Sequence, residues 1–175
     1  VESGQTLTGL TLTVTGVADS TETLTIDGTS VALTNGSGTT STSSLAYAVT
    51  VSGGMATVSL TGGSLSVGAM QTLVDGIGYS NSSQAPTAGN RVVTLTQLQD
   101  SGGTASGGID TTTLSIASTV AVTGVNDAPT LIATSANPTF VEDGSAVSVF
   151  SGSGVGTVES GQTLTGLTLT VTGVA

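Results

Sequence analysis

The chain has 175 residues and a net charge of −10, with eleven acidic residues, a single basic residue, Arg91, and no Cys or His. This negative charge would repel nucleic acid and anionic membranes, so we expect neither as a partner. Soluble cations are the expected partners. Without His, Lys or Cys the usual nucleophile–base pairs cannot be built, and two Tyr, two Phe and no Trp offer no aromatic platform for a sugar, so we expect no enzyme.

Apolar residues that alternate with Thr predict β-strands along most of the chain. In the first segment Leu10, Leu12 and Val14 alternate with Thr, a period of two that turns one set of side chains inward. Similar runs predict strands at Glu22–Ile26, Ser30–Thr34, Ser44–Val51, Ala56–Thr61, Arg91–Gln99 and Thr111–Val125. Gly-containing turn sequences separate these runs, so the pattern predicts an all-β fold, an antiparallel β-sandwich.

One segment, SVGAMQTLVDG, has a helical pattern instead. Ser66 can cap a helix, Met70 and Leu73 lie at helical spacing, and Asp75-Gly76 can end it. The segment predicts about two helical turns that close one side of the sandwich, with Met70 and Leu73 filling the core.

Residues 1–18 and residues 158–175 have the same sequence, VESGQTLTGLTLTVTGVA, at an offset of 157 residues. Solenoid repeats have periods of about 20 to 50 residues, whereas 157 residues is the size of an independent domain. We therefore expect a window from a tandem array of domains. In this interpretation residues 1–125 are a sandwich that lacks its first segment. Residues 126–130 are a linker stiffened by Pro129, and 131–175 supply the opening strands of the next repeat, including one from 158–175.

The order of several motifs resembles bacterial cadherin-like domains, in the version found in giant surface adhesins exported by type 1 secretion. The motifs that carry the resemblance are QDSGGTASGGIDTTTLSIASTVAVTGVNDAPT, FVEDGSAVSVF, VTGVADSTETLTI and LVDGIGYSNSSQAPTAGNRVVTLTQLQD. The resemblance implies a Greek-key, immunoglobulin-like sandwich joined end to end with its neighbours, with Ca²⁺ at the junctions. It also implies an extracellular or bacterial cell-surface location.

Strand order then suggests which residues would meet at such a junction. We expect the end of the strand Arg91–Gln99 to lie at the same pole as the acidic loop after the first alternating strand, which would bring Asp100 beside Asp19 and Glu22. The candidate calcium ligands are Asp19, Glu22, Asp100, Asn126, Asp127 and Glu142, with Asp143 as a substitute for Glu142. Ligands that offer only oxygen suit a hard cation. The alternative is that these residues bond locally in turns, as Asp and Asn often do.

The expected function is that of a structural spacer or adhesion repeat in a long extracellular bacterial fibre. The expected partners are adjacent copies of the same repeat, lateral fibre contacts, or glycans on a host or surface. One alternative is a separate fibre subunit, in which residues 128–175 complete the next copy by strand complementation. Another is a carbohydrate-binding module. Arg91 is expected either to pair with a nearby acid or to be solvated.

Overall fold

The computed structural model describes residues 4–173. The chain divides into two compact units, Val1–Gly124 and Val125–Ala175, which we call the sandwich unit and the C-terminal unit. No helix among the described residues has the length and apolarity to cross a membrane.

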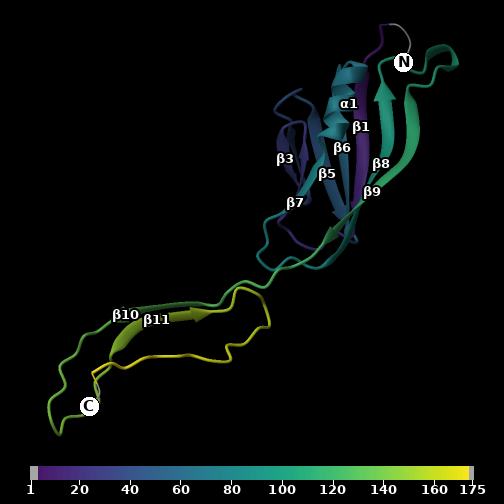
Figure 1. Ribbon diagram of the computed structural model, residues 1–175. Helices are drawn as coiled ribbons and strands as arrows, with labels where there is room; N and C mark the ends of the chain where they lie inside the picture. The colour runs from purple at the N-terminus through teal and green to yellow at the C-terminus, as the bar shows by residue number, and fades with distance from the viewer. Residues whose placement is uncertain (1–3, 174–175) are drawn as a thin grey trace. The chain divides into compact units, whose positions relative to one another are not determined.

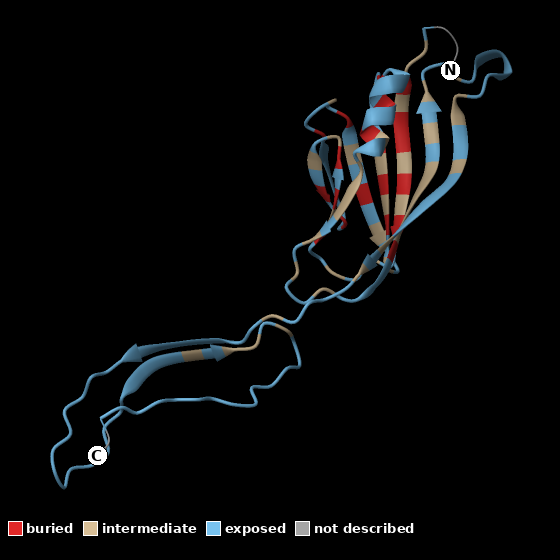
Figure 2. Cartoon of the chain, in the orientation of Figure 1, coloured by how far each residue is buried: buried red, intermediate tan, exposed pale blue. Residues whose placement is uncertain are grey.

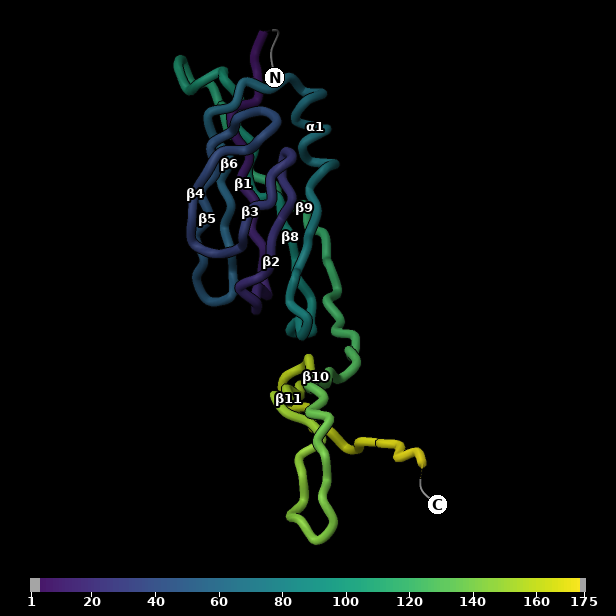
Figure 3. The backbone as a smooth tube through the Cα atoms, turned by 90° about the vertical axis from the view of Figure 1, so that its left-hand side faces the viewer, coloured from purple at the N-terminus to yellow at the C-terminus, as the bar shows by residue number. Residues whose placement is uncertain are grey.

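The sandwich unit contains two antiparallel sheets that face each other as two layers (Figures 1 and 3). The larger sheet has, in spatial order, β4 (Gly36–Thr39), β5 (Ala46–Ser52), β6 (Met55–Thr61), β1 (Leu7–Thr15), β8 (Gly89–Asp100) and β9 (Thr111–Val122). The smaller sheet has β3 (Thr29–Ala32), β2 (Glu22–Ile26) and β7 (Gly78–Asn81). The predicted all-β sandwich is thus confirmed.

β1 lies at the centre of the larger sheet because its two neighbours, β6 and β8, pair with it along both edges. Leu10, Leu12 and Val14 on β1 are buried, as the alternation with Thr predicts. They pack against apolar side chains of β2, β3, β6 and the helix, namely Leu24, Ile26, Val31, Ala56, Val58, Leu60, Met70 and Leu73. Figure 2 shows this core as the red residues of the sandwich unit.

The predicted helix is confirmed as α1 (Val67–Asp75). The Oγ atom of Ser66 accepts a hydrogen bond of 3.2 Å from the amide of Ala69, which satisfies one of the free donors at the helix start. Met70 and Leu73 are buried in the core as expected. The amide of Gly76 donates to the carbonyl of Thr72 at 3.1 Å where the helix ends.

Two short strands were not predicted, β4 and β7. The β4 sequence, GSGT, has no apolar alternation, yet it pairs with β5 at the edge of the larger sheet. A side chain at Gly38 would meet the Tyr47 hydroxyl at 2.6 Å, so Gly leaves room for the ring of Tyr47 across the pair. A 3-10 turn, η1 (Ala105–Gly107), lies in the loop between β8 and β9.

The C-terminal unit contains a β-hairpin formed by β10 (Thr130–Ser135) and β11 (Phe150–Gly156). Among its described residues, 125–173, none is buried. The described residues 158–173, which are expected to supply a strand of the next repeat, form no strand in this chain. In the sandwich unit the same sequence becomes a strand between two neighbours, and the copy has no such neighbours.

Candidate functional site

The single basic side chain, Arg91, lies inside the sandwich unit and is bound to Glu22. Its Nε and Nη2 atoms donate to the two carboxylate oxygens of Glu22 at 2.9 and 3.0 Å. The amides of Ala18 and Asp19 donate to Glu22 Oε1 at 2.9 and 2.8 Å. The expectation that Arg91 pairs with a nearby acid is confirmed, and both oxygens of Glu22 are engaged within the protein.

These bonds set the charge states of the pair. Burial alone would raise the pKa of Glu22, but the hydrogen bonds from Arg91 and from the two amides outweigh it, so this pKa lies below its ordinary value. The hydrogen bond to Glu22 raises the pKa of Arg91 above its ordinary value, against the effect of burial. Both groups therefore stay ionised in the folded protein.

Asp19 extends this cluster towards the loop before β8. Its carboxylate accepts from the hydroxyl and the amide of Thr87 at 2.6 and 2.9 Å and from the side-chain amide of Asn81 at 2.7 Å. It also lies 3.7 Å from Arg91 Nη2. The hydrogen bond from the Thr87 hydroxyl is the main reason that the pKa of Asp19 is lowered. Asp19 thus connects the loop before β8 to β7 and to the buried ion pair.

Tyr79 lies on β7 next to this cluster. Burial, and then the negative charge of Glu22, raise the pKa of its hydroxyl. The hydroxyl oxygen is buried and has no hydrogen-bond partner. The ring helps to line an apolar groove between the two sheets.

Asp100 is not part of the cluster, so the predicted grouping of Asp100 with Asp19 and Glu22 is wrong. β8 runs antiparallel to β1, with Asp100 opposite Leu7 and Val92 opposite Thr15. The end of β8 therefore lies beside the start of β1, whereas the acidic loop follows the end of β1. The Asp100 carboxylate accepts from the amide of Gly102 at 2.8 Å in the turn after β8.

The linker residues Asn126 and Asp127 belong to the C-terminal unit and contact the repeated segment there. The Asp127 amide donates to Glu159 Oε1, and Gln162 Nε2 donates to Asn126 Oδ1 at 2.6 Å. The other carboxylate oxygen of Glu159 is buried without a hydrogen-bond partner. Glu159 is not among the calcium ligands expected from the sequence, although it is the second residue of the repeated segment.

Glu142 and Asp143 are exposed in the segment between β10 and β11. Asp143 has a left-handed backbone, with φ of 61°, in a turn where the amide of Gly144 bonds to the carbonyl of Val141 at 2.9 Å. Within residues 4–173 no three acidic side chains come together as a metal-binding group. The calcium site remains a prediction.

The repeated segment occurs in two environments within one chain. In the sandwich unit its apolar residues are almost fully buried: Leu7 is 7% exposed, Leu10 2%, Leu12 0% and Val14 0%. In the second copy the matching residues are largely exposed: Leu164 is 49% exposed, Leu167 74%, Leu169 72% and Val171 65%. Since the two sequences are identical, the presence or absence of neighbouring strands accounts for the difference.

Comparison with known proteins gives no match: no family model, no curated protein and no solved structure is significantly similar to this chain.

Proposed function

We propose that this chain is a structural spacer repeat of a long extracellular bacterial fibre or adhesin, without catalysis. The observation that carries the proposal is the repeated segment, which is the central strand of a packed sandwich in one copy and an unpaired, exposed stretch in the other. A segment of this kind is expected where one domain ends and the same domain begins again.

The energetics favour a partner for the second copy. Fully burying a Leu or Val side chain stabilises a protein by roughly 1.5–3 kcal/mol. The exposed residues Leu164, Leu167, Leu169 and Val171 would therefore gain several kcal/mol between strands like β6 and β8. In a tandem array those strands come from the sequence that follows the second copy, as they do in the sandwich unit.

Calcium at the junction is a part of this proposal. Asn126, Asp127 and Glu159 suit the ion best, because they supply only oxygen ligands and one Glu159 oxygen is buried without a hydrogen-bond partner. Asp19 and Glu22 suit it poorly, because Thr87, Asn81 and Arg91 already occupy their oxygens.

The same observation favours a second candidate, a separate subunit that polymerises by strand complementation. In that case residues 128–175 of one chain would complete the fold of another chain through main-chain pairing.

A denaturing gel of the protein from its natural source distinguishes the two candidates. A covalent array runs at a multiple of the mass of one repeat, whereas a separate subunit runs near 16.7 kDa. The spacer proposal predicts the larger mass. A single band near the mass of this chain would contradict it in favour of the subunit.

A further inference from the structure

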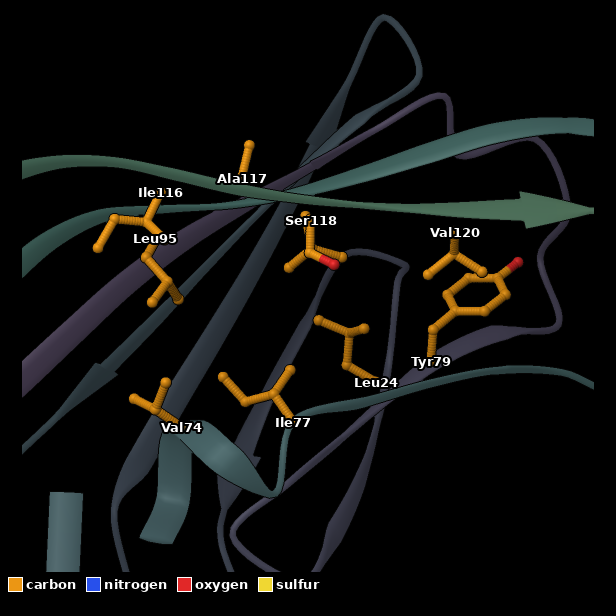
Figure 4. A pocket seen from close by; sticks show the side chains of 10 residues that line it. Leu24, Val74, Ile77, Tyr79, Leu95, Ile116, Ala117, Ser118 and Val120 are labelled. Carbon is orange, nitrogen blue, oxygen red and sulfur yellow. The ribbon is translucent and has the colours of Figure 1, made fainter. Parts of the chain in front are cut away.

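An apolar groove of about 300 Å³ runs between the two sheets of the sandwich unit, on the side where the smaller sheet ends. Leu24, Ile77 and Tyr79 form one wall, and Val93, Leu95, Ile116 and Val120 of β8 and β9 form the other. Figure 4 shows Ile116, Ser118 and Val120 pointing from β9 towards that first wall, while Ala117 points away, as the pleat of a strand requires.

The groove exists because the two sheets differ in width, with six strands facing three. The strands β1 and β6 are covered by the smaller sheet and the helix, and their apolar side chains are buried. β9 has no such cover, and Ile116 is 59% exposed. Apolar side chains that line an open groove between layers indicate that a further element covers them.

Both sheets also have a free edge at the groove. Among the described strands, β7 pairs only with β2, and β9 pairs only with β8. Unpaired strand edges offer backbone donors and acceptors to an incoming strand. The groove therefore suits an extended segment with apolar side chains better than a small molecule.

The β10–β11 hairpin of the C-terminal unit has the matching properties. Leu131 lies opposite Val155 in the hairpin, so these two side chains share one face. They are 54% and 55% exposed. In the C-terminal unit they line an open pocket together with Leu164 and Leu167 of the second copy, and about half of each side chain remains exposed.

Chain order places such a hairpin next to the groove of a complete domain. The hairpin comes directly before the second copy of the β1 sequence, and residues 157–163 between them span at most about 28 Å. Thr130 lies opposite Gly156, so both ends of the hairpin lie together. Leu95, in the groove wall, is paired with Leu12. Leu7 matches Leu164 of the second copy. Leu12 lies five residues, or roughly 17 Å, along β1 from Leu7, which is less than the span of residues 157–163.

We propose that the groove of the sandwich unit takes the β10–β11 hairpin of a second copy of this chain. This inference rests on the proposed function, because it assumes that the second copy of the β1 sequence folds as the first does. The contact joins two different surfaces, so a pair of copies still has a free groove on one copy and a free hairpin on the other. Such a head-to-tail contact extends into a filament rather than closing as a dimer.

Sedimentation of the 175-residue chain over a concentration series tests the proposal. The wild-type mass should rise above 16.7 kDa with concentration. Leu131→Asp in the hairpin and Ile116→Asp in the groove should each hold the chain at the mass of one copy. Both residues are exposed, so circular dichroism should show the sandwich still folded.

Mixing the two variants provides the sharpest outcome. The Leu131→Asp chain keeps an intact groove and the Ile116→Asp chain keeps an intact hairpin, so the mixture should form a pair of two chains and nothing longer. Ile109→Asp, at an exposed site outside the groove, should associate as the wild type does.

Three results would overturn the inference: a wild-type chain that stays single, a mixture that forms no pair, or association that Leu169→Asp removes while Leu131→Asp does not. The last result would assign the contact to the second copy of the β1 sequence. The mass of the natural protein on a denaturing gel tests the spacer function separately, since a short natural chain would refute the covalent array and leave the head-to-tail contact standing.

Discussion

Arg91 holds both carboxylate oxygens of Glu22, at 2.9 and 3.0 Å, across 69 residues of sequence. The two side chains are 2% and 0% exposed, so the only positively charged side chain of the protein is buried and paired with an acid. The pair joins β2 of the smaller sheet to β8 of the larger one. Its role is therefore to fix how the two layers sit on each other rather than to bind a ligand.

Removing the charge of Glu22 should destabilise the sandwich unit strongly. Glu22→Gln removes the carboxylate that binds Arg91 directly and leaves only Asp19, 3.7 Å from Arg91 Nη2, as a counter-charge; breaking a buried ion pair typically costs about 3–5 kcal/mol. Urea unfolding measures the loss, with Asp75→Asn at an exposed site of α1 as the matched control, for which we expect little change. Equal stability of the two variants would show that the ion pair contributes nothing.

Acid should weaken the same region. The pKa values of Glu22 and Asp19 are lowered in the folded protein from ordinary values of 4.5 and 3.8. A lowered folded pKa contributes stability that is fully present above the ordinary value and is lost as the pH falls through the folded value. The free energy of unfolding should therefore fall below about pH 4.5. Asp19→Asn should make this decline shallower, and a decline of unchanged steepness would argue against a contribution from Asp19.

Trypsin should cleave the folded protein slowly. Arg91 is the only residue in the chain that trypsin recognises. It is 2% exposed and lies on β8, a strand that pairs with β1 on one side and with β9 on the other. Cleavage then requires unfolding, so Glu22→Gln should be cut faster than the wild type in a time course on a gel. Rapid cleavage of the native wild type would mean that β8 is not held in the sheet.

Calcium should stiffen an array of repeats more than it stabilises each sandwich, because no calcium ligand is expected in the core. A chain of three repeats is compared with calcium and with chelator by small-angle scattering and thermal melting. The expected result is a longer, straighter particle with calcium and a smaller change in melting temperature. Asp127→Ala should abolish the change in length, whereas a response that survives this substitution would rule out the junction site.

The sequence predicts the elements whose stability comes from their own pattern. The bounds of β2 are predicted without error, and the Ser66 cap with Met70 and Leu73 predicts α1. β4 and β7 are not predicted because they are short and have few apolar residues. Such strands form where a neighbouring strand offers an edge, which the local sequence does not reveal. The described residues 158–173 form no strand for the converse reason, since a strong strand pattern needs neighbouring strands to pair with.

The candidate site was less predictable because it depends on which strands are neighbours. Asp100 was expected beside Asp19. Because β8, a strand of 12 residues, pairs antiparallel with β1, Asp100 lies at the end of β8 that is far from Asp19. Asp100 lies nine residues along β8 from Arg91, which contacts Asp19 and Glu22, so the carboxylate is roughly 30 Å from its expected place. The Glu22–Arg91 pair likewise joins two strands from different sheets, and alternation along the chain carries no information about that pairing.

Thiol labelling at position 169 tests most directly whether residues 158–175 supply a strand of a following copy. The chain has no Cys, so Leu169→Cys supplies a single reactive site. In the 175-residue chain, where Leu169 is 72% exposed, the thiol should react quickly. In a longer chain, with the sequence of Asp19–Gly124 added after Ala175, it should become as protected as the thiol of Leu12→Cys. Ile109→Cys, at an 84% exposed site, should react quickly in both chains. A Leu169→Cys thiol that reacts as quickly in the longer chain would contradict the account.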